Sequence, residues 1–100
     1  MHEEPIERIH IFDGKVHDAE RYEEYKRHVP ALIARHGGEY LVRGGGFEVI
    51  EGTWNPTRIV LLKFPDRAAI RAFFADPDYQ PLLKLRHAIA DSHAVAVDGI

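Results

Sequence analysis

The sequence predicts an α+β fold, in which four strands form one antiparallel sheet and helices cover one of its faces. Short apolar runs and helical stripes follow one another in the order strand, helix, strand, strand, helix, strand. Aspartates that suit helix N-caps, and clusters of glycine and proline, separate these segments. A chain of 100 residues, 45% of them apolar, is enough for one core, so residues 1–100 are expected to form a single domain.

The first strand is predicted over residues 6–12. Alternation would point Ile9 and Ile11 to one face of the sheet and Phe12 to the other. The Asp-Gly-Lys segment at residues 13–15 is typical of a turn, so the strand should end there.

The first helix is predicted over residues 18–36. Asp18 suits the N-cap, and Gly37 can adopt the left-handed conformation that ends a helix. Pro30 lies inside the pattern and should kink or locally loosen the helix, because proline lacks a backbone donor. The inward stripe consists of Tyr22, Tyr25, Val29, Leu32, Ile33 and His36.

The middle of the chain predicts two further strands. Residues 39–43 form the second strand, and the three glycines at residues 44–46 break it as a bulge or tight turn. Residues 47–51 should resume extended structure, and residues 52–56 should turn. The third strand then covers residues 58–64.

The last part of the chain predicts a broken helical region and a final strand at residues 94–97. Asp66 should cap a helix that runs to about residue 75. Asp76 should cap a second helix, with Pro77 at its first position. The inward residues are Ala69, Ile70, Phe73 and Phe74, followed by Tyr79, Leu82, Leu83, Arg86 and Ile89.

This order is the split βαβ plan of a ferredoxin-like sandwich, for which strand order 4-1-3-2 is usual. The face without helices is not polar, because residues 59–62 are apolar on both sides and Phe12 points to it. Such a face usually marks an interface, so we expect a homodimer whose sheets pack face to face. Alternatively, Arg8, His10 and Lys63 solvate this face.

The composition excludes several classes of function. Without cysteine the chain has no disulfide, thiolate metal site or cysteine nucleophile. A formal charge of −3 argues against nucleic acid as a partner. No apolar run approaches the roughly 20 residues of a membrane span, and the acidic start lacks the apolar segment of a secretory signal. A cytoplasmic protein without a membrane partner is expected.

Seven histidines are the one unusual feature of the composition. None forms a helical pair such as HExxH, so neither a metal nor another cofactor is predicted. His36 is the candidate catalytic residue, because an imidazole titrates near neutrality and a cleft between helix and sheet could use it for proton transfer. Alternatively, it only caps the last carbonyls of the helix.

Six residues are candidates for ligand binding. Arg43 directly precedes the glycines at residues 44–46, where a close backbone approach and a guanidinium suit a carboxylate or phosphate. Its alternative is an ion pair with Glu48 or Glu51. Trp54 could contact a partner or cover a pocket mouth. The other four fall at inward positions, where arginines need partners and tyrosines either line a pocket or only pack: Tyr25, Arg58, Tyr79 and Arg86.

Several motifs occur together along the chain. They are His36-Gly37-Gly38, Tyr40 to Gly45, Glu48 to Trp54, Pro56, Arg58, Phe64-Pro65, Phe73, Pro77-Asp78-Tyr79 and Arg86. Through them the chain resembles the domain of unknown function 1330 family, within the dimeric α/β-barrel superfamily. The resemblance implies a ferredoxin-like subunit and a dimer whose sheets form a barrel. It implies no established reaction, because relatives in the superfamily include haem-degrading and quinone-forming monooxygenases, lactone isomerases and proteins without known activity.

Two functions are therefore open. In the first, the protein is a small enzyme that transforms an anionic or aromatic organic molecule by cofactor-free oxygenation or proton-transfer isomerisation. In the second, it is a non-catalytic dimeric binding or stress-related protein, and the same residues are structural. An open cleft whose arginines lack carboxylate partners favours the first, and arginines paired to carboxylates favour the second.

Overall fold

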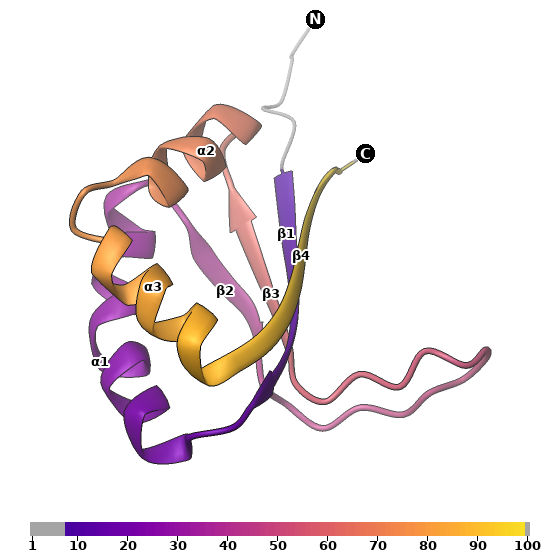
Figure 1. Cartoon of the computed structure of the whole chain (residues 1–100). Coiled ribbons are helices and arrows are strands. Elements are labelled where there is room, and N and C mark those ends of the chain that lie inside the picture. The colour runs from indigo at the N-terminus through magenta and orange to yellow at the C-terminus, as the bar shows by residue number, and fades with distance from the viewer. Residues whose placement is uncertain (1–7, 100) are drawn as a thin grey trace, which may run out of the picture.

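The computed structural model describes residues 8–99, of which residues 8–13 are described by their backbone alone (Figure 1). The elements follow the predicted order, and the second helical region is broken in two as expected. They are β1 (Arg8–Val16), α1 (Ala19–Arg35), β2 (Glu39–Arg43), β3 (Ile59–Phe64), α2 (Arg67–Ala75), α3 (Gln80–Ile89) and β4 (Ala90–Asp98). The α+β, ferredoxin-like class is confirmed.

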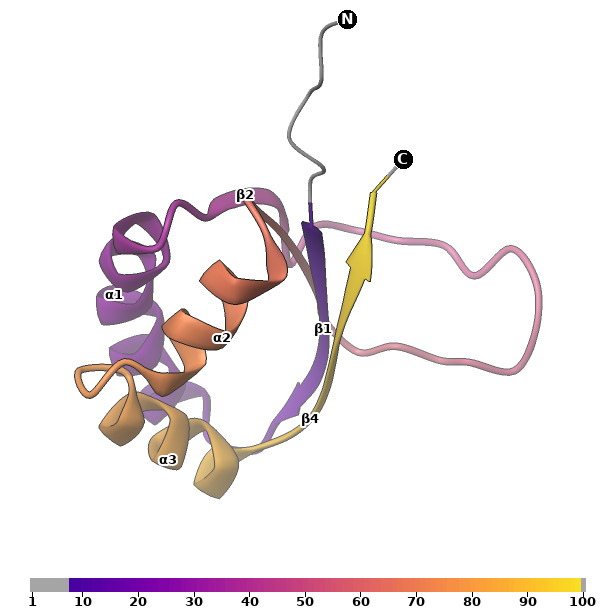
Figure 2. The same cartoon turned by 90° about the horizontal axis from the view of Figure 1, so that it is seen from above.

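The four strands form one antiparallel sheet in the order β2-β3-β1-β4. All three helices lie on the same face of this sheet, as Figure 2 shows from above. Burial alternates along β3, where Val60, Leu62 and Phe64 are buried beneath the helices. Residues Ile59 and Leu61 point to the face without helices and are half-buried. We call this second surface the open face.

The turn predicted at residues 13–15 is wrong, because this segment continues β1. Gly14 pairs with Ser92, and its N–H donates to the carbonyl of Arg58 at 3.1 Å. The partner strand explains the difference, since β4 begins at Ala90 rather than at residue 94 and offers hydrogen bonds up to Val16. Residues 6 and 7 of the predicted strand lie outside the described part of the chain.

The pairing register also assigns alternate positions of β1 to the opposite faces of the sheet from those predicted. Phe12 pairs with Val60, which is buried beneath the helices, whereas Ile11 pairs with Leu61 and Val95 in the row of the open face. The apolar character of the open face therefore comes from other positions. Val95 is 56% exposed there.

Helix α1 begins and ends as predicted. Asp18 accepts a hydrogen bond from the N–H of Arg21 at 3.1 Å, which satisfies one free donor of the first turn. At the other end Gly37 has a φ of +78°, and Gly38 donates its N–H to the carbonyl of Ile33 at 2.9 Å. This is the hydrogen-bond pattern of a glycine C-cap. The helix runs through Pro30 without interruption.

The second helical region differs in how α3 begins. Asp66 caps α2 as predicted, accepting from the N–H of Ala69 at 2.7 Å. Asp76 does not cap α3; it ends α2, and its carboxylate accepts from the N–H of Asp78 at 2.9 Å. This bond holds a turn, so α3 begins only at Gln80, with Pro81 rather than Pro77 in its first turn. Within residues 8–99, no helix is long and apolar enough to cross a membrane.

The core lies between the helices and β3. Three aromatic side chains hold its centre, with Phe64, Phe73 and Tyr79 each no more than 2% exposed. The Phe73 ring lies 4.2 Å from the ring of Tyr79 and 6.0 Å from that of Phe64, measured between centroids. The predicted inward stripes of α1, α2 and α3 meet here.

Residues 44–58 form a long connection between β2 and β3, which we call the arm. The extended segment predicted at residues 47–51 pairs with no strand in the described part of the chain. In both views the arm projects away from the helices (Figures 1 and 2). It exposes Phe47, Val49, Ile50 and Trp54.

Candidate functional site

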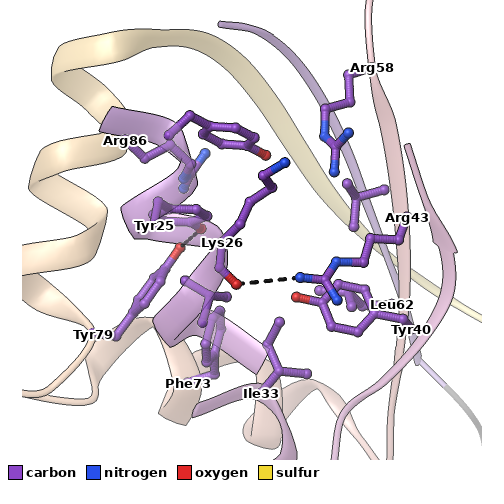
Figure 3. Close-up of a pocket in the computed structure, with 13 residues that line it drawn as sticks. Tyr25, Lys26, Ile33, Tyr40, Arg43, Arg58, Leu62, Phe73, Tyr79 and Arg86 are labelled. Atoms are coloured by element: carbon purple, nitrogen blue, oxygen red, sulfur yellow. Dashed lines mark hydrogen bonds between the residues drawn. The ribbon is translucent and has the colours of Figure 1, made fainter. Parts of the chain in front are cut away.

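A cleft lies between α1 and the strands β2 and β3, and α3 closes its inner end (Figure 3). The space between its walls is about 500 Å³, including the part open to solvent. Its walls are apolar or aromatic, and arginine and lysine side chains enter it from α1, β2, the last residue of the arm and α3. Five of the six predicted ligand-binding residues line it: Tyr25, Arg43, Arg58, Tyr79 and Arg86.

Tyrosines form the inner part of the cleft. The hydroxyls of Tyr25 and Tyr79 share a hydrogen bond of 2.7 Å, drawn in Figure 3. Tyr22 stacks on Tyr25, with ring centroids 5.6 Å apart and planes 11° apart. Burial raises the pKa of the Tyr25 phenol far above its usual range, so this hydroxyl stays protonated. The Tyr25 hydroxyl therefore offers a hydrogen bond but no anionic base.

Arg86 lies at the same end of the cleft and is 4% exposed. Its Nη1 donates to the hydroxyl of Ser92 on β4 at 2.8 Å. The inward position predicted for Arg86 is thus correct, and the Ser92 hydroxyl is one of its partners. This bond ties α3 to β4 and fixes the guanidinium against the cleft wall.

Cations surround the outer end of the cleft. A hollow of about 630 Å³, again including the part open to solvent, opens there, lined by Glu23 together with Lys26, Arg27, Arg43 and Arg58. We call the last four residues the basic mouth. Glu23 is the single carboxylate that lines the hollow. It forms an ion pair with Lys26 at 2.8 Å, which lowers the pKa of Glu23. The hollow therefore carries a net positive charge, which attracts anions toward the tyrosines.

Arg43 is positioned by the proline in α1. In a regular helix the carbonyl of Lys26 would accept from the N–H four residues later, but that residue is Pro30, which has none. Arg43 Nη2 donates to this carbonyl instead, at 3.4 Å (Figure 3). The guanidinium also lies 4.7 Å from the ring centroid of Tyr40. Pro30 thus creates the acceptor that holds Arg43 across the mouth.

Arg58 depends on the first glycine of the arm. Gly44 has a φ of +71°, and a Cβ at this position would collide with the Arg58 guanidinium. The guanidinium lies 5.6 Å from the ring centroid of Tyr22. Arg58 Nε is buried and has no hydrogen-bond partner among the described residues. A buried donor without an acceptor is costly, and an anionic ligand would relieve that cost.

The predicted catalytic residue His36 lies outside the cleft. Its Nε2 donates to Asp76 Oδ2 at 2.8 Å, and Arg35 Nη1 reaches the same oxygen at 3.0 Å. Asp76 is 8% exposed, and these bonds tie the end of α1 to the end of α2. This geometry favours a structural role for His36, and a catalytic role stays a prediction.

The Asp76 cluster makes stability depend on pH in the acid range. Hydrogen bonds from His36, the N–H of Asp78 and Arg35 lower the pKa of Asp76 from 3.8 to about 2. Because the folded state favours the ionised carboxylate, its contribution is present above pH 4 and is lost as the pH falls toward 2. We expect Asp76→Asn to remove this part of the slope, measured by urea unfolding between pH 2 and 6. The assignment would be contradicted if the free energy of unfolding of Asp76→Asn changed with pH as steeply as that of the unchanged protein. Asp78→Asn is the control and should keep the slope of the unchanged protein.

Two polar residues of the cleft, Lys26 and Tyr40, were not among the predicted site residues. Tyr22, predicted on the inward stripe of the first helix, lines the cleft as well. The helical spacing of Tyr22 and Lys26, four residues apart, was a usable signal, since it brings the ammonium 5.6 Å from the ring centroid. Trp54 lies on the arm and does not line the cleft. Among the described side chains, those of residues 14–99, no three of His, Cys, Asp or Glu gather to hold a metal ion.

Residues 9–100 match the profile of a family described as domain of unknown function DUF1330. The chain belongs to this family. The match covers nearly all of the sequence, as the motifs predicted. No curated protein matches this DUF1330 chain.

Solved structures share the fold of this DUF1330 chain at low identity. A protein of unknown function from Rhodopseudomonas palustris is 19% identical with a TM-score of 0.80, covering 97% of this chain and 85% of its own. SnoaB, a cofactor-independent oxygenase from Streptomyces nogalater, is 18% identical with a TM-score of 0.64, covering 92% and 91%. A dimeric ferredoxin-like protein of unknown function from Thermobifida fusca is 14% identical with a TM-score of 0.55, covering 97% and 94%. At such identities the likeness shows the fold alone.

Proposed function

We propose that the cleft binds a small aromatic anion, with its ring among the tyrosines and its charge at the basic mouth. The observation that carries the proposal is the juxtaposition of these two parts, since the mouth and the aromatic interior share Lys26, Arg43 and Arg58. A guanidinium pairs with a carboxylate through two parallel hydrogen bonds, which suits Arg58 and Arg43. Among the described residues, no carboxylate forms an ion pair with Arg43 or Arg58.

Binding is better supported than acid–base catalysis. Among the described residues that line the inner cleft there is no histidine and no carboxylate, and Glu23 at the outer end is paired with Lys26. Burial raises the pKa of the Tyr25 and Tyr40 phenols, and arginine does not act as a base. The cleft therefore offers recognition of charge and ring.

We expect benzoate and 2-naphthoate to bind more tightly than their neutral amides, by at least about tenfold, because only the carboxylates pair with the basic mouth. Arg58→Ala should weaken 2-naphthoate binding by roughly ten- to hundredfold. Isothermal titration calorimetry measures both effects. Arg71→Ala is the matched control, because it removes the same charge from an exposed position of α2 that does not line the cleft.

The proposal fails if the amides bind as tightly as the carboxylates, or if Arg58→Ala and Arg71→Ala leave affinity equally unchanged. Absence of binding by both carboxylates, with the fold intact by circular dichroism, would also overturn it. Arg58→Lys keeps the charge but loses the planar fork, and it should retain only part of the affinity.

We also propose that two copies pack through their open faces as a homodimer. Leu41, Val95 and Val97 are 45–56% exposed there, and Ile59 and Leu61 are half-buried. An apolar surface of this kind on one face of a sheet is typical of an interface. The Thermobifida fusca protein of the same fold is described as dimeric, which supports a dimer here.

A further inference from the structure

The arm carries the two most exposed large apolar side chains among the described residues. Ile50 is 83% exposed and Trp54 59%, with Phe47 at 47% and Val49 at 45%. Four large apolar side chains within eight residues are unusual on a solvated loop, which is normally polar. The exposed parts of these side chains form an apolar surface that is available to a partner.

Among the described residues the arm makes no β-pairing of its own. The described ladder hydrogen bonds stop at its two ends, where Gly44 donates to the carbonyl of Ile59 at 2.9 Å and the carbonyl of Arg58 accepts from Gly14. A Cβ built at Gly45, Gly46 or Gly52 would meet nothing within 4 Å. Pro56 is buried, so the arm is anchored near its second end, whereas these glycines lie in open space.

The direction of the arm points to a second copy. It leaves the sheet on the side away from the helices, which is the side of the open face (Figures 1 and 2). Each of its two runs spans about six residues and reaches roughly 20 Å when extended. Packed sheets lie only about 10 Å apart. In a face-to-face dimer the arm is therefore long enough to pass the interface and lie along the partner subunit.

The apolar area of the arm also suits a second copy. Aromatic side chains bury on the order of 150–250 Å² each. The accessible area buried by two half-exposed arms, counted together with the surface that they cover on the two partners, is roughly 1,500 Å². This is the size of a standard stable interface. Leu41, three residues before the arm begins, is 52% exposed and adds apolar surface close to where the arm leaves β2.

We infer that the arm is a clasp that crosses the dimer interface and packs Phe47, Val49, Ile50 and Trp54 against the partner subunit. This inference rests on the proposed dimer and is independent of ligand binding in the cleft. It assigns Trp54 to the partner interface rather than to the ligand. Two-fold symmetry makes the contact reciprocal, so each chain both gives and receives an arm.

Trp54 is the only tryptophan of the sequence, so its fluorescence reports on the arm alone. At high protein concentration we expect a particle of two chains by light scattering. Trp54 should then emit at short wavelength and resist quenching by acrylamide. On dilution, the mass should fall to one chain while emission moves to longer wavelength and quenching rises, with the same midpoint.

The outcomes separate the clasp from the dimer. A dimer whose Trp54 is quenched equally at every concentration would overturn the clasp and leave the open-face dimer standing. A single-chain mass at every concentration would overturn both. Neither result bears on the titrations with aromatic carboxylates, which test the cleft.

A pair of arm variants gives a second readout. Ile50→Ser should raise the dimer dissociation constant by at least about a hundredfold, because the symmetric contact removes the side chain twice. Glu48→Gln on the same arm is the matched control and should change it little. Since Ile50 is exposed in the single chain, its loss leaves the fold intact. Equal dissociation constants for both variants would overturn the clasp.

Discussion

Phe73→Ala is expected to lower the free energy of unfolding by about 3–5 kcal/mol, the cost of removing a buried phenylalanine. Phe73 is 2% exposed and lies where α2, α3 and β3 meet. Its ring contacts those of Phe64 and Tyr79, and it packs against His36 with centroids 6.1 Å apart. The cavity would open beneath the cleft, so neighbouring side chains cannot close it without moving Tyr79.

Urea unfolding of Phe73→Ala measures this loss, and Phe74→Ala provides the comparison. Phe74 touches the same cluster but is only partly buried, so its loss should cost clearly less. Similar losses for the two variants would mean that the cluster is not centred on Phe73. A loss below about 1 kcal/mol for Phe73→Ala would contradict the described core.

The fold was predictable because local signals agreed with tertiary packing. Asp18, Asp66 and Gly37 each act at the helix end that the sequence indicated. The boundaries that failed depend on distant partners. Gly14 extends β1 because β4 pairs with it, and the carboxylate of Asp76, expected to cap α3, instead binds His36, forty residues away in sequence.

The candidate site was predictable residue by residue but not as an arrangement. Inward positions of Tyr25, Tyr79 and Arg86 follow from helical spacing. The partner of Arg43 does not, since it is a backbone carbonyl left free by a proline on another element. Sequence patterns identify side chains that point inward, whereas the hydrogen-bond partners of those side chains depend on the packed structure.

Pro30→Ala is expected to stabilise the protein and to weaken ligand binding. A proline inside a helix costs about 3 kcal/mol relative to alanine, and its restriction of the unfolded chain returns about 0.5–1 kcal/mol of this. A net gain of about 1–2 kcal/mol on replacement is therefore expected in urea unfolding, because position 30 is only half-buried and loses little packing.

The gain in stability should be accompanied by weaker ligand binding, because the new N–H of residue 30 would donate to the carbonyl of Lys26. Arg43 would then lose its acceptor and sample other rotamers, so 2-naphthoate affinity should fall several-fold. In a double-mutant cycle, Pro30→Ala should weaken binding in the natural chain but have little further effect in an Arg43→Ala background. Equal effects in both backgrounds would show that Pro30 acts on the cleft by another route. A destabilised Pro30→Ala would show that the proline ring fits the helix better than the missing hydrogen bond implies. The expected result is greater stability with weaker binding. It would show that Pro30 lowers the stability of α1 and at the same time positions Arg43 for binding.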